Sequence, residues 1–198
     1  DRFSKEELDK FFDILYDGEN KNRVWVHSHF GTNDIDDIFT KLRFMIIGCD
    51  CKWVVVDHLH MLVSAVHEGD ERRAIDSIMT RLRSLVEETG AGIILVSHLR
   101  RVDGNKGHEN GIEVSLSHLR GSASIAHLSD SVIGLERNQQ AEGDEANTTT
   151  IRILKNRYTG DTGIATHLHY NRDTGRLTEV DNPYEAEYNV ENKEEVPF

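Results

Sequence analysis

The chain has few of the residues that cross-link small secreted proteins or interrupt secondary structure. It contains two cysteines and two prolines in 198 residues, and both prolines lie beyond residue 180. Cys49 and Cys51 are one residue apart, which is too few and too close for a disulfide framework and agrees with a reducing compartment. Partly buried thiols explain this pair better than a Cys-x-Cys metal half-site does.

Long apolar runs and an excess of positive charge are also missing. No apolar run is long enough to cross a bilayer, and no signal-peptide pattern opens the chain, so we expect a soluble intracellular protein that does not bind a membrane. The formal net charge of -12 argues against broad coating of nucleic acid, but a local basic strip is enough for binding in a narrow channel. The length fits one domain and a tail. Because the chain begins at Asp1 and not at Met, we expect it to be part of a longer protein.

Two apolar segments each end on a polar side chain. Residues 53–56 lead into Asp57, and residues 92–97 lead into His98. In an open parallel sheet, ligands bind outside the carboxyl ends of the strands, so both side chains are expected at one crevice. One carboxylate suits magnesium, which keeps water and phosphate oxygens as its other ligands, and a histidine can donate a hydrogen bond to a phosphate. The alternative is that Asp57 is a turn or N-cap residue and that His98 bonds to a loop.

Hydrophobic periodicity places the first elements. Ser4 and Glu7 form a capping-box pattern before a helix that ends near Gly18, and residues 23–30 alternate like a strand. Residues 33–48 and 71–89 have the helical period, and the second of these helices stops at Gly90.

The second half of the chain has a different composition and a different pattern of predicted elements. Residues 100–113 are rich in glycine and poor in apolar side chains, which predicts a mobile loop, and residues 117–126 predict a short helix. Residues 131–135, 148–155 and 163–170 predict strands joined by short links, and such links make antiparallel hairpins. The acidic segment 181–198 has too little apolar mass to fold and is expected to be disordered.

Three His-x-His pairs offer a competing interpretation. They are His27 with His29, His58 with His60, and His167 with His169. In a strand, residues i and i+2 share a face, so each pair could bind zinc in a metal-dependent hydrolase. The pairs fall at unrelated points of the chain and lack an obvious set of carboxylate ligands, so ordinary histidines explain most of them.

Basic side chains stand next to glycine in two further segments. In Leu119-Arg-Gly-Ser, Arg120 joins small residues at a helix start, where backbone donors and a guanidinium suit phosphate. Alternatively, the Gly-Ser pair only makes a turn. Lys155 and Arg157 end a strand before a glycine-rich hairpin and could reach a phosphate across a subunit boundary. The alternative is a charged edge that prevents aggregation.

These segments together carry a family resemblance. Val55-Val-Asp-His58, Val96-Ser-His-Leu99, Asp70-Glu-Arg72, Leu119-Arg-Gly-Ser122, Leu135-Glu-Arg-Asn-Gln-Gln140 and Ile153-Leu-Lys-Asn-Arg-Tyr-Thr-Gly-Asp-Thr-Gly163 closely resemble the C-terminal motor of the primase-helicases of short-tailed bacteriophages. Twinkle and bacterial DnaB are more distant relatives. The resemblance covers roughly residues 23–180, and its last block is specific.

The resemblance implies an α/β fold with a RecA-like P-loop NTPase core of three layers. Its mixed sheet would be parallel in the first half and antiparallel in the later strands, without the N-terminal Walker A portion. Residues 1–180 would form this partial motor domain and residues 181–198 its disordered acidic tail. The implied function is a hexameric or heptameric ring helicase that hydrolyses ATP or dTTP with Mg²⁺ at subunit interfaces and moves along single-stranded DNA. Its place would be the cytoplasm of the infected bacterium.

The same resemblance implies roles around the nucleotide. Asp57 would be the Walker B carboxylate that holds magnesium through water, and His98 the γ-phosphate sensor. Arg157 would be the arginine finger for the neighbouring subunit's nucleotide, with Lys155 beside it. Two further residues match positions that pack on the base, Arg137 and Tyr170.

For DNA and partners, the resemblance implies another set of residues. Arg100, Arg101 and Lys106 would line the DNA channel, while Arg120 and His127 match a motif that links the phosphate end to that channel. The acidic tail with Phe198 resembles a terminus that binds the replicative DNA polymerase.

One departure from the family bears directly on activity. The pattern G-x-x-x-x-G-K-[ST] occurs nowhere in the chain, and the family's catalytic glutamate lies upstream of the matching region. We therefore expect the 198 residues alone to hydrolyse nucleotide poorly or not at all. The missing motif would also be compatible with a non-catalytic module for single-stranded DNA binding or assembly.

Overall fold

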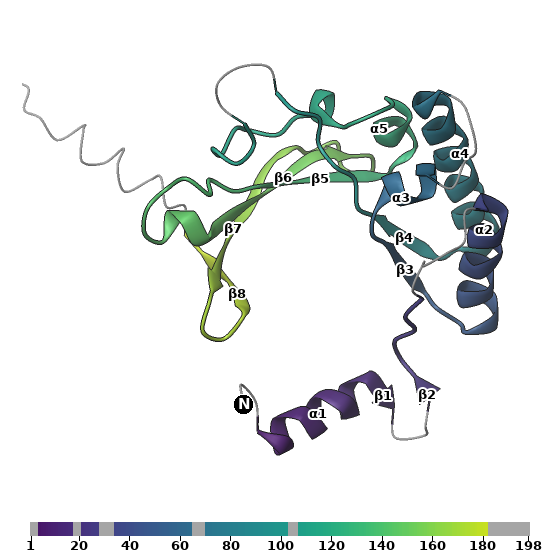
Figure 1. The fold of residues 1–198 in the computed structure, drawn as a ribbon, viewed down its shortest axis with the longest axis horizontal. Coiled ribbons are helices and arrows are strands. Elements are labelled where there is room, and N and C mark those ends of the chain that lie inside the picture. The colour runs from purple at the N-terminus through teal and green to yellow at the C-terminus, as the bar shows by residue number, and fades with distance from the viewer. Residues whose placement is uncertain (1–3, 18–20, 28–33, 65–69, 103–106, 182–198) are drawn as a thin grey trace, which may run out of the picture.

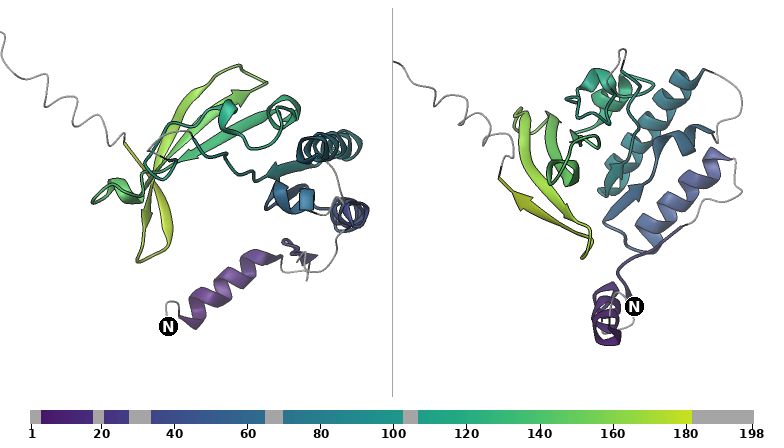
Figure 2. Two further views of the ribbon diagram at one scale, coloured as in Figure 1. Left: turned by 45° about the horizontal axis from the view of Figure 1, so that its top comes forward. Right: turned by 60° about the vertical axis from the view of Figure 1, so that its left-hand side comes forward.

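The computed structural model describes residues 4–17, 21–27, 34–64, 70–102 and 107–181. Figure 1 shows two main parts, a group of helices packed on a short parallel strand pair and a four-stranded antiparallel sheet. Helix α1 lies apart from both in Figures 1 and 2. Lys106 and Phe198, together with His29 and the tail after residue 181, lie outside the described residues.

Helix α1 (Lys5–Leu15) begins where the sequence predicts. The amide of Ser4 donates to Glu7 Oε2 at 2.9 Å and the amide of Glu7 donates to Ser4 Oγ at 3.3 Å, which is the expected capping box. Its apolar side chains Phe11 and Phe12 are exposed. The helix is followed by a two-stranded antiparallel ribbon of β1 (Tyr16–Asp17) and β2 (Lys21–Asn22).

The strand expected over residues 23–30 is wrong for its described part. Residues 23–27 form neither a strand nor a helix, and Val26 is 90% exposed. A strand requires a neighbouring strand to bond its backbone groups, and no strand in the described ranges pairs with this segment. Alternation of side chains alone could not reveal that.

The two strands expected before Asp57 and His98 form a parallel pair, and the helix predicted over residues 71–89 lies between them in the chain. Helix α2 (Ile35–Arg43) continues into a π-helical turn, η1 (Phe44–Gly48), and leads to strand β3 (Trp53–Val56). Helix α3 (Leu59–Ser64) and the long helix α4 (Glu71–Thr89) then lead to strand β4 (Gly92–Leu95). Gly90 ends α4 with φ of 69°, a left-handed conformation that glycine adopts without steric cost.

The hydrophobic core lies between the helices and one face of this strand pair. It joins α2, α3, α4 and the strands through the buried side chains Ile38, Phe39, Leu42, Ile46, Val54, Leu59, Leu62, Ile75, Ile78, Met79, Leu82 and Leu85. Ion pairs between Arg81 and Asp36 and between Arg43 and Glu88, both at 2.7 Å, hold α2 beside α4.

The opposite face of the strand pair is exposed. Trp53 is 69% exposed, Val55 64% and Ile94 51%. Within the described ranges, helices therefore cover this pair on one side, and the third layer of the expected fold is not formed by these residues.

The segment between β4 and the antiparallel sheet differs from its predicted single helix. It forms a 3₁₀ turn, η2 (Leu116–His118), and a short helix, α5 (Ser124–Leu128). Gly121 separates them with φ of 107°, and a Cβ atom there would collide with Ile75 of α4. The backbone leaves the helical conformation at Leu119 and Gly121, so the predicted helix is broken in two.

The later strands form an antiparallel sheet, as predicted. Strands β5 (Ser131–Glu136), β6 (Thr148–Asn156), β7 (Gly163–Asn171) and β8 (Arg176–Val180) lie in chain order, and a 3₁₀ turn, η3 (Glu145–Asn147), precedes β6. The sequence patterns do not predict β8, all of whose residues are exposed. The four strands and the β3–β4 pair are two separate hydrogen-bonded sheets within the described ranges.

The described parts of residues 100–113 contain no helix or strand, as expected for a loop. Asn110 pairs with Asn138, and the amide of Gln139 donates to the carbonyl of Glu109, so this side of the loop is attached to the end of β5. In the described part of the chain, no helix has both the length and the apolar character needed to cross a membrane.

Candidate functional site

Asp57 and His98 lie at the same edge of the parallel strand pair, as the position of the two strand ends predicts. Val56 of β3 is in register with Leu95 of β4, and the amide of Val96 donates to the carbonyl of Val56 at 3.0 Å. Because both strands run in one direction, the residues that follow them emerge together.

The Asp57 carboxylate is exposed and, within the described part of the chain, has no hydrogen bond or ion pair. It borders an open groove of 1170 Å³ that also includes His58, β3 and residues 23–27. A solvated carboxylate without protein partners suits magnesium, which retains much of its water shell. Asp57 therefore fits the metal that the family resemblance implies.

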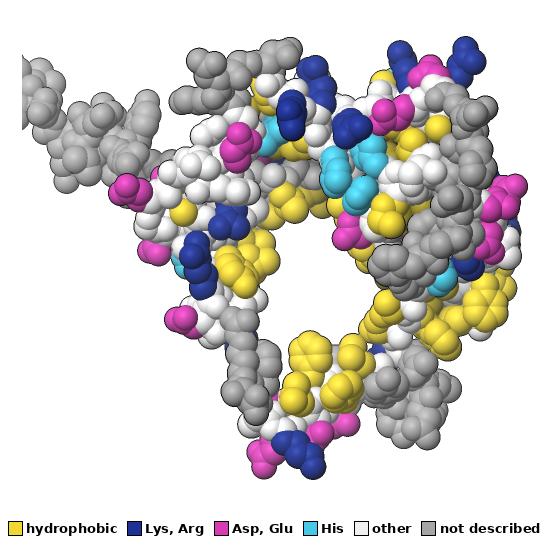
Figure 3. All heavy atoms as spheres, viewed as in Figure 1, with side chains coloured by type: hydrophobic (Ala, Val, Ile, Leu, Met, Phe, Trp, Pro, Cys, Tyr) yellow, Lys and Arg dark blue, Asp and Glu magenta, His cyan; other side chains and the backbone are white. Residues whose placement is uncertain are grey.

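Three histidines meet beside Asp57, at the edge where β3 and β4 end. The ring centroid of His98 lies 4.1 Å from that of His58 and 5.5 Å from that of His60. One nitrogen from each ring can be chosen so that all three lie within 4.8 Å of one another. Figure 3 shows histidine side chains gathered on this face, with acidic and basic side chains beside them.

The expectation that a His-x-His pair shares a strand face is wrong for His58 and His60. Both residues come after β3, and α3 begins between them at Leu59. The turn, and not a strand, brings the two rings to His98. In the third pair, His167 is buried and its Nδ1 lies 3.0 Å from Thr150 Oγ1.

His60 is placed among charged groups from two other elements. Burial, followed by the positive charge of Arg120, lowers the pKa of His60, and Glu71 opposes this change. Glu71 Oε1 lies 3.7 Å from His60 Nε2 and 3.5 Å from Arg120 Nη2. His60 is therefore neutral over a wider pH range than an ordinary histidine.

The Arg120-Gly121-Ser122 segment is attached to both sides of this site. The amide of Arg120 donates to the carbonyl of His98 at 3.2 Å. The Ser122 hydroxyl donates to the Asp76 carboxylate of α4, and this hydrogen bond is the main reason that the pKa of Asp76 is lowered. The basic segment is thus fixed between β4 and α4, with the half-exposed Arg120 side chain toward the histidines.

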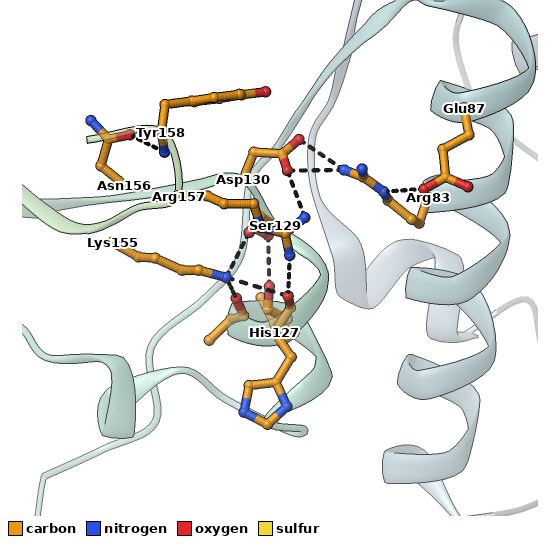
Figure 4. Close-up of polar contacts among 11 residues, drawn as sticks. Arg83, Glu87, His127, Ser129, Asp130, Lys155, Asn156, Arg157 and Tyr158 are labelled. Carbon is orange, nitrogen blue, oxygen red and sulfur yellow. Dashed lines mark hydrogen bonds and ion pairs between the residues drawn. The ribbon is translucent and has the colours of Figure 1, made fainter. Parts of the chain in front are cut away.

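Lys155 and Arg157 are both bound within their own chain, as Figure 4 shows. Lys155 Nζ donates to three carbonyls at the end of α5, those of Ala126, His127 and Ser129. Lys155 thereby caps α5, whose last carbonyls lack helical partners.

Arg157 is attached to the same region by its guanidinium. Nη1 donates to Asp130 Oδ1 and Nη2 to the carbonyl of His127, both at 3.0 Å. Asp130 also accepts two hydrogen bonds from Arg83 of α4. The Arg157 side chain is 45% exposed, and no hydrogen bond or ion pair of the described residues joins it to Asp57 or His98.

The residues expected to pack on a nucleotide base lie at the other end of the antiparallel sheet. Arg137 follows β5, and Tyr170 lies near the end of β7; the register Glu136–Thr150–His167 brings these strand ends together. Arg137 Nε donates to the carbonyl of Ala146 at 2.7 Å, which anchors the turn before β6. Tyr170 is 36% exposed.

The described DNA-binding candidates follow β4. Arg100 and Arg101 are exposed, and Arg100 Nε donates to the carbonyl of Ser117 at 2.8 Å. His127 is exposed on α5, where its carbonyl accepts from Lys155 and Arg157. The structure thus gathers Asp57, His98 and Arg120 at one edge, and places the other candidates elsewhere on the chain.

Two acidic residues that organise these regions do not stand out in the sequence. Asp130 joins Arg83 to Arg157. Glu136 is buried, binds Arg152 at 2.6 Å, and accepts from the amide of Val114 at 2.8 Å. Their sequence neighbourhoods look like ordinary charged strand and turn positions, so contact with distant segments is the only signal.

Comparison with known families identifies a relationship that extends over nearly the whole chain. Residues 2–179 match the DnaB-like helicase C terminal domain. The DNA helicase/primase of Enterobacteria phage T3 is 41% identical over 170 residues, which are 86% of this chain. The chain spans 29% of that relative's length.

Solved structures share the fold at low sequence identity. A DnaB-like replicative helicase, described with its interactions with primase, aligns with a TM-score of 0.65 and 18% identity over 90% of this chain and 42% of its own. A solved ATPase domain gives a TM-score of 0.59 and 21% identity over 75% of this chain and 52% of its own. A KaiC-like protein of Pyrococcus horikoshii OT3 aligns with a TM-score of 0.52 and 15% identity over 74% of this chain and 56% of its own. These neighbours confirm the expected RecA-like fold class.

Proposed function

Because the chain belongs to the DnaB-like helicase C-terminal domain family, we propose that it is the C-terminal part of a ring-shaped replicative DNA helicase of a bacteriophage. The full protein couples NTP hydrolysis at subunit interfaces to movement along single-stranded DNA and duplex unwinding in the infected host's cytoplasm. The observation that carries this proposal is the pairing of β3 with β4, which delivers Asp57 and His98 to one edge.

At this edge, Asp57 holds magnesium through water, and the bound ion neutralises charge on the phosphates of ATP or dTTP. The exposure of Asp57 and its lack of partners among the described residues support this role. His98 donates a hydrogen bond to the terminal phosphate and responds to its loss. Arg120 contributes positive charge from the segment bonded to the His98 carbonyl.

Arg157 acts on the nucleotide of the neighbouring subunit. Its half-exposed guanidinium exchanges its bonds to Asp130 and the His127 carbonyl for phosphate oxygens when a second subunit meets this surface. Lys155 supports this surface by fixing the end of α5. Hydrolysis is therefore tied to assembly of a hexameric or heptameric ring.

The base and the DNA contact other parts of the domain. Arg137 and Tyr170 pack on the base, supported by the shared sheet end from which they project. Arg100, Arg101 and Lys106 bind the DNA backbone, and Arg120 with His127 links the phosphate end to the channel. The acidic tail ending in Phe198 binds the replicative polymerase, with charge steering the encounter and the aromatic ring anchoring it.

The chain needs a partner segment for turnover, because the sequence contains no phosphate-binding loop pattern. We expect the 198 residues alone to show no NTP hydrolysis above buffer, and the full-length protein to hydrolyse NTP and unwind forked DNA. If the full-length protein binds single-stranded DNA but shows no NTP-dependent unwinding, the chain would instead be a non-catalytic module for DNA binding or assembly.

The decisive test compares Asp57→Asn with Asp13→Asn, an exposed control on α1, in the full-length protein. Asp57→Asn should abolish magnesium-dependent NTP hydrolysis and unwinding, while Asp13→Asn keeps both. Full NTP turnover in the Asp57→Asn variant would refute the proposed nucleotide site.

A further inference from the structure

His58 and His60, which have no part in the proposed helicase reaction, meet His98 and form with it a group of three imidazoles. Magnesium prefers hard oxygen ligands, whereas these side chains offer nitrogen alone. The three rings come from two segments far apart in sequence, the turn after β3 and the end of β4. Their ligand nitrogens all lie within 4.8 Å of one another.

Several of these nitrogens are buried without partners. His58 Nδ1 and both ring nitrogens of His60 are shielded from solvent and lack a hydrogen bond. The Glu71 carboxylate, at 3.7 Å from His60 Nε2, is beyond hydrogen-bond distance. Buried polar atoms are nearly always satisfied, so three unpartnered nitrogens in one place are suited to accept a shared partner.

Charged side chains from two other segments lie next to His60. Glu71 Oε1 lies 3.7 Å from His60 Nε2 and 3.5 Å from Arg120 Nη2, so the carboxylate offsets the positive charge of Arg120 beside the three rings. A neutral imidazole keeps a lone pair on one ring nitrogen, which is the ligand for zinc and related ions.

We propose that His58, His60 and His98 bind a divalent transition-metal ion of the zinc class through one nitrogen each. Tetrahedral zinc with nitrogen ligands at about 2.0–2.1 Å places those nitrogens about 3.3 Å apart, which small rotations of the three side chains achieve. Three protein ligands leave one coordination position for water or an anion. This site is distinct from Asp57, whose carboxylate suits magnesium.

A consequence follows that rests on the proposed function. One ring nitrogen of His98 cannot bind a metal ion and donate a hydrogen bond to a terminal phosphate at the same time. A zinc-class ion bound through that nitrogen would block the hydrogen bond that His98 donates to the phosphate, and would so lower NTP hydrolysis. His60 acts here as a metal ligand and takes no part in the proposed reaction.

The test titrates Co²⁺, a spectroscopic substitute for Zn²⁺, into the purified tag-free protein and records its visible absorption. We expect saturable binding of a single ion per chain, with absorption typical of a low-coordinate nitrogen site, and displacement by Zn²⁺. His60→Gln and His98→Gln should each weaken Co²⁺ binding by roughly tenfold or more. Loss of a residue that only orients a metal ligand lowers metal affinity by about that factor, and loss of the ligand itself should lower it at least as much. The matched control is His169→Gln on β7, which should leave Co²⁺ binding unchanged.

Circular dichroism establishes that each variant is folded. Absence of saturable Co²⁺ binding in the folded protein, or equally tight binding in His60→Gln, would overturn the metal site. Neither result touches the proposed helicase function, which is measured without transition metals. Loss of NTP hydrolysis in Asp57→Asn with intact Co²⁺ binding would show that the two sites are separate.

Discussion

The carboxylate of Asp130 holds Arg157 at 3.0 Å, so the guanidinium expected to act on a neighbouring subunit is bound in its own chain. The same carboxylate binds Arg83 of α4. Asp130 thus connects the helical part of the chain to the turn after β6, and it sets the position from which Arg157 would reach across a subunit boundary.

Replacing Arg157 with alanine tests this arrangement. In the full-length protein, Arg157→Ala should lower NTP turnover by about 10³-fold or more while nucleotide binding is retained, because an arginine supplied in trans stabilises the transition state. Turnover and fluorescent-nucleotide binding are measured side by side. Arg73→Ala, an exposed control on α4, should change neither; weaker nucleotide binding as the main defect of Arg157→Ala would contradict its role.

The exposed arginines after β4 should contribute to DNA binding through charge. Arg101→Ala in the full-length protein should weaken single-stranded DNA binding similarly for all sequences and make the dependence of log K on log salt shallower by about 0.7, the value for one phosphate contact on a single strand. Fluorescence anisotropy at several salt concentrations measures this slope. Arg176→Ala on β8 is the control, and an unchanged slope in Arg101→Ala would remove the residue from the DNA contact.

The buried ion pair of Glu136 and Arg152 should be important for stability. Glu136 is 8% exposed and accepts from both Arg152 and the Val114 amide. Glu136→Ala should lower the free energy of unfolding by about 3–5 kcal/mol, because the amide of Val114 loses its acceptor and the largely buried guanidinium keeps only the exposed Glu113 at 3.3 Å. Urea denaturation measures the loss, with Glu142→Ala as an exposed control. A change below about 1 kcal/mol, as for a surface pair, would contradict this account.

The protonation of His60 should respond to Arg120. Burial and then Arg120 lower the pKa of His60, so Arg120→Ala should raise this pKa, although burial keeps it below its ordinary value. A depressed folded-state pKa means that the unfolded chain takes up a proton first. Stability from neutral His60 is therefore lost as pH falls from about 6.5 through the folded-state pKa. NMR titration of the histidine resonances tests this; an unchanged or lower His60 pKa in Arg120→Ala would refute it.

Local patterns predicted much of the framework. The cap at Ser4, the apolar period of α4 and the stop at Gly90 depend on neighbouring residues, and the structure confirms them. The common edge of Asp57 and His98 was also predictable, because parallel strands release their following residues on one side. The strand expected over residues 23–30 fails because strand formation depends on a partner that alternation does not identify.

The contacts around the site required the folded chain. Nothing near residue 60 shows that the turn into α3 brings its ring beside His98, and nothing near residue 130 indicates that one carboxylate binds Arg83 and Arg157. Likewise, the helix expected over residues 117–126 is divided where Leu119 and Gly121 take non-helical conformations beside α4.

The sequence by itself determined where α1, α2, α4 and strands β3 to β7 lie, the order in which they follow, and the polar residues that come after β3 and β4. Only the tertiary structure decided which distant side chains meet, and so it alone revealed the three-histidine group and the bonds that hold Lys155 and Arg157. The physical reason is the distance along the chain over which each interaction acts. Capping and periodicity act within a few residues, whereas contacts between distant segments are set by how whole elements pack.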